Sequence, residues 1–476
     1  MHRLIASTIH QKEETLTLVE KRRLNNLALK KAEKNLGLFF ERVNIKSLIA
    51  RKSFWLTLLL TITCGVIIGV MSWLFLNSLS IVGYFQEHYA FTICLIPLAG
   101  LLTAVIYTKF GKGAHRGNNL IIESVNEKAD VPLRMAFLAF FFTILTHFSG
   151  GSAGREGTAV QMGGSITNKV TKRFHLTDKH RELLILSGIS AGFGSVFGTP
   201  LAGVFFGMEV CYVGKLRYDA LLHCMLSSFI ASTVTYILGV SHDSHIINVI
   251  PAVTPQFIGI ILFAAVIFGI TGKLFAITIH KLKGLYGKIF VNYLLRALVS
   301  SCIVLFAFLV LNGVRYTGLS TWLIDAGFNG TVQPYDPIMK FGFTSLTLGA
   351  GFQGGEVTPL FDIGASLGGW IGQISGVEPS LLAALGLIAV FGCATNTPIT
   401  TVILGVELFG VQALPYYVIV TVISYYVSGH SSIYSSQIVI TSKKLLSKEH
   451  VGLRLDALPK RRGNVLRKLF YKEKKT

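Results

Sequence analysis

The sequence predicts an all-α protein that crosses a membrane many times. Hydrophobic residues make up 51% of the 476 residues, charged residues only 14%, and the mean hydropathy is +0.58, a composition too apolar for an ordinary soluble domain. Apolar runs long enough to span a bilayer recur along the chain. Segments of the first and second halves also resemble each other. We therefore expect two inverted structural repeats that contain discontinuous helices.

The apolar runs define the expected membrane segments. The 48 glycines fit closely packed and interrupted helices better than a loose bundle. A further apolar region, 340–375, is cut by glycines and by Pro359. The runs themselves, several of them long enough for more than one helix, are residues 54–82, 91–109, 132–150, 183–212, 218–240, 250–279, 290–312 and 380–428.

An internal repeat is visible in two Thr-Pro segments. Residues 199–209 and 397–407 both open on Thr-Pro, continue as an apolar stretch and end on a glutamate. The simpler alternative is two unrelated helix starts, because Thr is a good N-cap and Pro a good first helical residue. Further matches at nearly the same offset favour a repeat: Glu156, Thr158 and Gly164 correspond to Glu356, Thr358 and Gly364.

The charge of the chain is placed at its ends. The formal net charge is +20, and basic residues concentrate near both termini and in the segment 169–181. This positive-inside pattern predicts a multi-pass protein of the cell membrane with both termini in the cytoplasm and an even number of crossings. No nucleic-acid recognition motif accompanies the charge, so nucleic acid is not an expected partner.

These patterns divide the chain into four expected parts. They are a basic, partly helical cytoplasmic segment (1–50), two membrane halves (51–240 and 241–445) and a basic cytoplasmic tail (446–476). Within the first part, residues 10–42 show helical spacing of apolar residues among Lys and Glu, which indicates a helix lying on the membrane or on the cytoplasmic face. A regulatory partner site is the alternative interpretation of this segment.

Two glutamates lie inside apolar sequence, in residues 154–158 (GREGT) and 354–359 (GGEVTP). An ionised carboxylate at bilayer depth costs at least about 2.5 kcal/mol, so each is a functional candidate. The neighbouring glycines expose main-chain N–H groups, and helix N-termini at these places would hold an anion through those groups and the helix dipole. The sequence therefore predicts a midplane anion site where discontinuous helices of the two halves meet.

These motifs resemble the CLC family of chloride channels and proton-coupled anion transporters. The resemblance rests on residues 154–157 (GREG), 354–359, the helix start at 200–203 (PLAG) and Tyr434, and it runs from about residue 50 to 445. It implies a homodimer with one anion pore per subunit. Glu156 would be the external gating glutamate, or else a structural helix cap or partner of Arg155. Tyr434 would line the pore, or else belong to the interfacial tyrosines.

Departures from the family pattern resemble its fluoride-transporting branch. The stretch 116–123 lacks the serine that chloride-handling members usually carry, and Thr158 replaces the usual proline. Val210 stands where chloride/proton antiporters have a second glutamate, while Glu356 replaces an apolar residue and has Thr358 beside it. The resemblance thus implies a fluoride/proton antiporter that exports fluoride.

The chemistry of fluoride is consistent with these exchanges. Fluoride is small and strongly hydrated, so its site must replace water with short, strong hydrogen-bond donors, which Thr358, Asn118 and a protonated Glu356 would supply. Without a glutamate at 210, Glu356 would also carry the proton, because burial raises the pKa of a carboxylic acid. The alternative is a partly solvated acid that only shapes the pore. Glu209 and Glu407 are expected to satisfy structural partners at helix ends.

The predicted site contains two acids and an anion-binding set. The acids are Glu156, for gating and proton coupling, and Glu356, for handling the proton and fluoride. The residues expected around the anion are Gly117, Asn118, Gly154, Arg155, Gly157, Thr158, Gly355, Val357, Thr358 and Tyr434. The expected partners are the fluoride ion, the proton, the lipid bilayer and a second copy of the chain.

Other functions remain open at this point. A chloride channel or chloride/proton antiporter of the same fold is the first alternative. An intramembrane enzyme is a distant one, because His147, His180 and His223 have no metal-ligand spacing and no nucleophile has a credible base. No metal or cofactor is expected, and the six scattered cysteines predict reduced core residues rather than disulfides.

Overall fold

A computed structural model describes residues 52–443 and 450–458 of the chain. The chain separates into two compact units, Met1–Leu58 and Leu59–Thr476, and the account below concerns the second. The helix expected within 10–42, and most of the two basic end segments, lie outside the described residues. The division into 51–240 and 241–445 stays a prediction.

Helices account for nearly all regular structure among the described residues. Two short strands, β1 (Tyr212–Val213) and β2 (Ile438–Val439), pair in parallel with Tyr212 opposite Ile438. The 3-10 turns are η1 (Ala90–Leu95), η2 (Ala114–Arg116), η3 (Tyr218–Ala220), η4 (Gly313–Tyr316), η5 (Val411–Ala413) and η6 (Leu455–Ala457). The α-helices are α4 (Lys52–His88), α5 (Ile96–Phe110), α6 (Asn118–Asn126), α7 (Arg134–Phe148), α8 (Glu156–Arg173), α9 (Asp178–Phe197), α10 (Pro200–Glu209), α11 (Leu221–Ile237), α12 (Pro255–Ile289), α13 (Tyr293–Val310), α14 (Trp322–Asn329), α15 (Asp336–Gly349), α16 (Val357–Ser375), α17 (Pro379–Thr395), α18 (Pro398–Phe409) and α19 (Leu414–Ser428).

The membrane segments follow the apolar runs, and glycine and proline divide the long ones. Six helices in the described part of the chain are long and apolar enough to cross a membrane. The run 183–212 breaks between α9 and α10, where Gly198 ends one helix at φ +70° and Pro200 begins the next. Asn396, at φ +60°, and Pro398 separate α17 from α18 in the same way.

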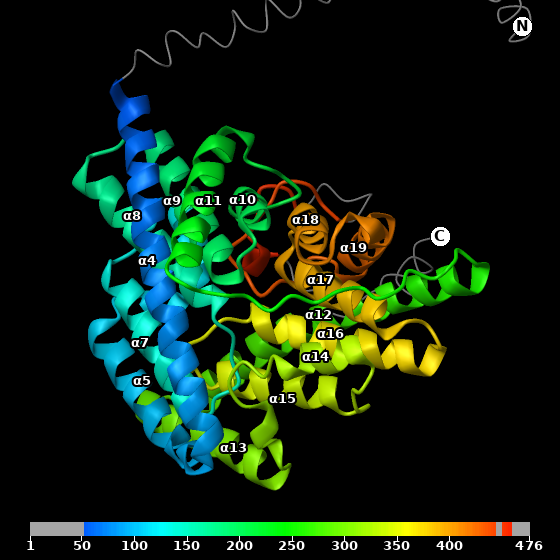
Figure 1. The fold of residues 1–476 in the computed structure, drawn as a ribbon. Helices are drawn as coiled ribbons and strands as arrows, with labels where there is room; N and C mark the ends of the chain where they lie inside the picture. The colour runs from blue at the N-terminus through cyan, green and yellow to red at the C-terminus, as the bar shows by residue number, and fades with distance from the viewer. Residues whose placement is uncertain (1–51, 444–449, 459–476) are drawn as a thin grey trace, which may run out of the picture. The chain divides into compact units, whose positions relative to one another are not determined.

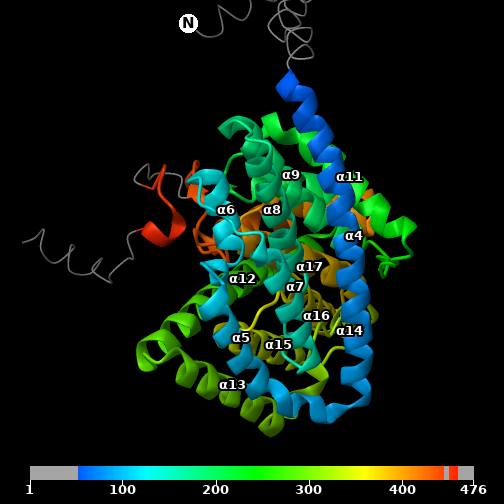
Figure 2. The same cartoon turned by 90° about the vertical axis from the view of Figure 1, so that its left-hand side faces the viewer.

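The two halves repeat the same helical order, α8 to α11 and α16 to α19. In each half the first two helices pack side by side (Figure 1; Figure 2). Glycines allow this contact, since a Cβ on Gly163 would lie 2.1 Å from the carbonyl oxygen of Gly188, and one on Gly364 2.3 Å from that of Gly386. No side chain fits at such distances. The predicted all-α fold with two inverted repeats is confirmed.

Each half supplies a carboxylate to the other at the repeated Thr-Pro helices. Glu209, at the end of α10, accepts hydrogen bonds from the N–H groups of Ile399 (3.0 Å) and Thr400 (2.8 Å) and from the Thr400 hydroxyl (2.7 Å). Glu407 of α18 accepts the N–H groups of residues 201–202 at the start of α10, at 2.9 and 2.7 Å. These N–H groups have no partner within their own helices, and the helix dipole favours an anion there. Both glutamates thus fill the structural role expected of them.

We predict that Glu209→Gln destabilises the protein by about 1–3 kcal/mol, because an amide NH₂ would face buried N–H donors that the carboxylate now satisfies. Thermal unfolding in detergent measures this as a lower midpoint. Glu87→Gln, at an exposed position of α4, is the control and should leave the midpoint unchanged. Equal midpoints for the two variants would contradict a stabilising role for the Glu209 contacts.

Candidate functional site

Three helices begin close to one another around Gly157. They are α6, α8 and α16, whose first residues are Asn118, Glu156 and Val357. A Cβ on Gly157 would lie 2.8 Å from the Asn118 side-chain nitrogen, 3.1 Å from the Cα of Gly355 and 3.5 Å from a carboxyl oxygen of Glu356. The positive ends of three helix dipoles therefore meet in one place, as an anion site requires.

A main-chain bridge joins the two predicted motifs. The N–H groups of Gly154 and Gly355 each donate to the carbonyl of the other, both at 2.7 Å. A Cβ on Gly154 would lie 2.8 Å from the Pro359 ring, so only glycine fits. The bridge fixes the start of α8 against the start of α16, although the two lie in different halves of the sequence.

The Glu156 carboxylate occupies the N-terminus of α16. Both of its oxygens lie 2.6 Å from the Thr358 hydroxyl, and one also accepts the Thr358 N–H at 3.0 Å and the Arg155 N–H at 3.2 Å. The Arg155 guanidinium lies 3.6 Å from the other oxygen, and Glu156 is fully buried. A helix N-terminus, a hydroxyl and a nearby cation thus bind a carboxylate where an inorganic anion would fit.

Thr158 and Val357 lie in the same region but direct their side chains elsewhere. The Thr158 hydroxyl is 2.7 Å from the hydroxyl of Thr143 on α7, and the Val357 side chain is buried. The N–H groups of residues 155–157 surround Gly355. Among the predicted anion-binding residues of this region, the polar groups come from the main chain and from Thr358.

A cavity of about 830 Å³ brings together the rest of the predicted set. Gly117, Asn118, Glu356 and Tyr434 all line it, while Glu156 does not. Tyr434 is buried apart from this contact, and its ring lies edge-on to Phe206 of α10. Basic side chains share the lining, including Lys283, Arg296, Arg116 and Arg454. The cavity is therefore suited to collecting anions before they reach the helix N-termini.

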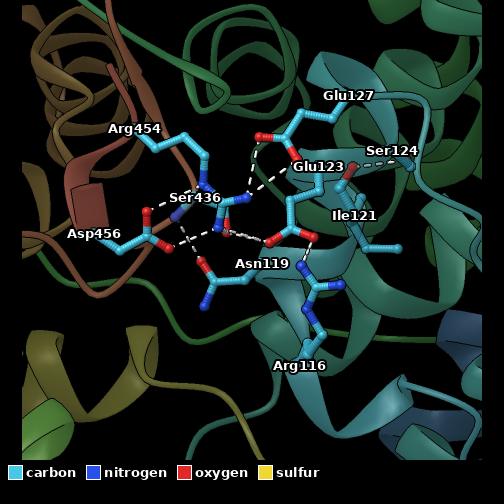
Figure 3. Close-up of polar contacts among 9 residues, drawn as sticks. All are labelled: Arg116, Asn119, Ile121, Glu123, Ser124, Glu127, Ser436, Arg454 and Asp456. Atoms are coloured by element: carbon cyan, nitrogen blue, oxygen red, sulfur yellow. Dashed lines mark hydrogen bonds and ion pairs between the residues drawn. The ribbon is translucent and has the colours of Figure 1, made fainter.

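A charged cluster holds one wall of this cavity in place (Figure 3). The buried carboxylate of Glu123 on α6 pairs with Arg116 and with Arg454, the latter at 3.0 Å. Glu123 also accepts a hydrogen bond from the Ser436 hydroxyl at 2.7 Å, and the Ser436 N–H donates to Asn119 at 3.0 Å. The segment that carries Tyr434 is thus tied to the helix that begins at Asn118.

Arg454 fastens the C-terminal described segment to the same cluster (Figure 3). It bonds to Glu127 at 3.0 Å and to Asp456 at 2.6 Å. Burial lowers the pKa of Arg454, but the bonds to Asp456 and Glu127 outweigh this and raise it overall. Sequence reasoning missed this cluster, because 331 residues separate Glu123 from Arg454 and no local pattern links them.

Metal binding has no structural support in the described part of the chain. No group of three or more His, Cys, Asp or Glu side chains there could hold a metal ion. The roles predicted for the acids and for the anion-binding set stay predictions, although the structure brings the residues themselves together.

Inverted repeats whose helix N-termini surround a buried carboxylate, next to a basic cavity, define a membrane channel or transporter for anions. The family model of voltage gated chloride channels matches residues 99–429. The chain belongs to this family, which confirms the resemblance found in the sequence.

Three proteins are similar to this chain in sequence or in fold. A protein of Pseudomonas syringae pv. tomato described as a chloride/fluoride channel protein is 40% identical over 382 residues, covering 79% of this chain and 84% of the relative. The crystal structure of a CLC-type fluoride/proton antiporter superposes with a TM-score of 0.79 at 36% identity, covering 82% of this chain and all of that one. A slow cyanobacterial Cl⁻/H⁺ antiporter shares the fold, with a TM-score of 0.66 at 19% identity over 78% of this chain and 94% of that one.

Proposed function

We propose that this chain is a fluoride/proton antiporter that exports fluoride across the cell membrane. The observation that carries the proposal is the Glu156 carboxylate held by the Thr358 hydroxyl and N–H at the start of α16. These donors are short and strong, which suits a small, strongly hydrated anion. The similarity to the CLC-type fluoride/proton antiporter supports the same substrate.

Gating follows from competition for these donors. An ionised Glu156 carboxylate takes the position that fluoride would take, so the two anions exclude each other. Protonation removes the charge that holds the carboxyl against the N-terminus of α16 and against Arg155. Proton binding at Glu156 therefore opens the site to fluoride, and loss of the proton closes it again.

We assign to Glu356 the onward transfer of the proton. It lines the cavity, and its carboxyl lies beside Gly157, next to Glu156 in the chain. At the position of the second glutamate, Val210 offers only a main-chain carbonyl, which accepts a hydrogen bond from Gln437 at 2.8 Å. In antiport the proton moves against fluoride, from Glu156 to Glu356 and then into the cavity, and this route needs no acid at 210.

The remaining assignments accompany this function. Transport involves no covalent chemistry, so we propose a transporter rather than an enzyme. We also propose that both termini are cytoplasmic, that the chain forms a homodimer, and that the bilayer covers exposed apolar side chains such as Phe263 and Phe306. Arg155, Gly154, Gly157 and Gly355 would position the gate, with Asn118 and Tyr434 lining the route.

A chloride channel or chloride/proton antiporter is the second candidate. Val210 favours the channel, because channels of the family also lack the second glutamate at this position. A passive channel would conduct without regard to a proton gradient, which separates the two mechanisms experimentally.

We predict that fluoride leaves proteoliposomes containing the purified protein much faster than chloride, and that an opposing proton gradient drives fluoride uphill. Ion-selective electrodes measure both anions, and protein-free liposomes give the background. Chloride efflux equal to or faster than fluoride efflux would rule out fluoride selectivity. Fluoride efflux that ignores the proton gradient would favour the channel.

We predict different defects for two neighbouring substitutions. Glu356→Gln keeps the side-chain volume but cannot titrate, so proton movement should stop or become uncoupled from fluoride. Thr358→Val deletes a donor and should slow fluoride transport about tenfold or more, because a hydrogen bond to a charged group contributes about 1.5–3 kcal/mol, while protons still move with the remaining fluoride. The measurement is simultaneous fluoride and proton flux.

The two variants serve as controls for each other in that assay. A Glu356→Gln protein that still drove fluoride uphill on a proton gradient would show that the proton travels by another route. Equal loss of coupling in both variants would remove the distinction between the two roles.

A further inference from the structure

A buried ion pair lies next to the site and has no part in the mechanism above. The Lys340 ammonium, on α15, is 3.4 Å from a carboxyl oxygen of Asp362 on α16, and both side chains are fully buried. Burying two charges costs several kcal/mol per ion, and apolar residues of similar size are often at least as stabilising. A buried pair in a membrane protein is a functional candidate.

Lys340 uses its hydrogens on other acceptors. Its ammonium donates to the Ser152 hydroxyl at 3.1 Å and to the carbonyls of Gly318 and Leu319 at 3.2 and 2.9 Å. Three acceptors match the three N–H bonds of an ammonium group. Lys340 is therefore held as a cation, and its attraction to Asp362 is mainly electrostatic.

Asp362 has the opposite character. Neither of its carboxyl oxygens has a hydrogen-bond partner within the described residues, although both are buried. Buried polar atoms without a partner are rare and need an explanation. Glu156 differs, because Thr358 and Arg155 supply it with donors. Asp362 is thus a carboxylate whose oxygens are both free to take a proton.

The position of Asp362 connects it to the gate. It lies four residues after Thr358 on α16, hence one turn further along the same face. Thr358 is the residue whose hydroxyl binds the Glu156 carboxylate, so Asp362 lies one turn of α16 beyond that contact. Two further titratable side chains lie nearby: His147 on α7, beside Gly318, and the buried Asp336, four residues before Lys340 on α15.

Lys340 and its interaction partners lie outside the cavity. Asp362, Lys340 and Ser152 are absent from its lining. Ser152 precedes the motif that contains Glu156, and Gly318 and Leu319 belong to a partly exposed loop between η4 and α14. The Lys340–Asp362 pair therefore lies between Glu156 and a surface loop, apart from the cavity that Glu356 lines.

We propose that Asp362 supplies the proton that Glu156 takes up, with Lys340 stabilising the Asp362 carboxylate that remains. This inference rests on the proposed antiport. In the step, the O–H bond of protonated Asp362 breaks and an O–H bond forms on Glu156, so Asp362 becomes the carboxylate and Glu156 the acid. The total charge of the cluster does not change. While Asp362 is neutral, the uncompensated charge of Lys340 favours the returning Glu156 anion.

The test compares proton and fluoride fluxes in variants of the full chain. Asp362→Asn removes the proton site and keeps the volume, and the double variant Lys340→Gln/Asp362→Asn also removes the unpaired cation. Ser366→Ala, one turn further along the same helix, is the control, because the Ser366 hydroxyl bonds only to main-chain carbonyls of its own helix. Proteoliposomes with a fluoride electrode and a proton-sensing dye give the number of protons moved per fluoride.

We expect both Asp362 variants to move at least tenfold fewer protons per fluoride than the wild type, and Ser366→Ala to keep the wild-type ratio. A double variant that folds and keeps the wild-type ratio would overturn the proposal and leave the antiport standing. Failure of both Asp362 variants to fold would also overturn the proposal, because the ion pair would then have a structural role. Uncoupled fluoride flux in the wild type would instead refute the antiport itself.

Discussion

The contact between the Glu156 carboxylate and the start of α16 is the interaction on which the rest of the site depends. It requires two segments from different halves of the chain to approach within main-chain contact, which the mutual hydrogen bonds of Gly154 and Gly355 achieve. It also requires the absence of a Cβ at Gly157, where Asn118 and Gly355 crowd the main chain. The inverted repeat, the glycines and the helix breaks all serve to bring free N–H groups to one point.

Three carboxylates near this point have different surroundings. Glu156 is bound by hydrogen-bond donors, Glu356 faces a cavity lined with basic side chains, and Asp362 has a buried lysine but no hydrogen bond among the described residues. Different surroundings give acids different proton affinities, and a proton can then move between them in a defined order. In our account the proton enters at Asp362, opens the gate at Glu156 and passes to Glu356.

The sequence predicted the fold, which is confirmed, and Glu156 as the gate, which stays a prediction, because both have local signals. Apolar runs mark the helices, Gly198 and Pro200 mark a break, and a glutamate between glycines marks the predicted gate. The orientation of Thr158 toward Thr143 could not be predicted, since it depends on how α7 packs against α8. The pairs Lys340–Asp362 and Glu123–Arg454 were missed, because partners far apart in the sequence are not visible until the chain is folded.

The central claim is that fluoride and the Glu156 carboxylate compete for the same donors. Calorimetric titration of fluoride into the detergent-solubilised wild type and Glu156→Ala, at one pH, tests this most directly. The account predicts fluoride binding at least about tenfold tighter in the variant, a difference of about 1.4 kcal/mol, because the α16 N-terminus and the Thr358 hydroxyl are then unoccupied. Equal or weaker fluoride binding by a folded Glu156→Ala protein would contradict it.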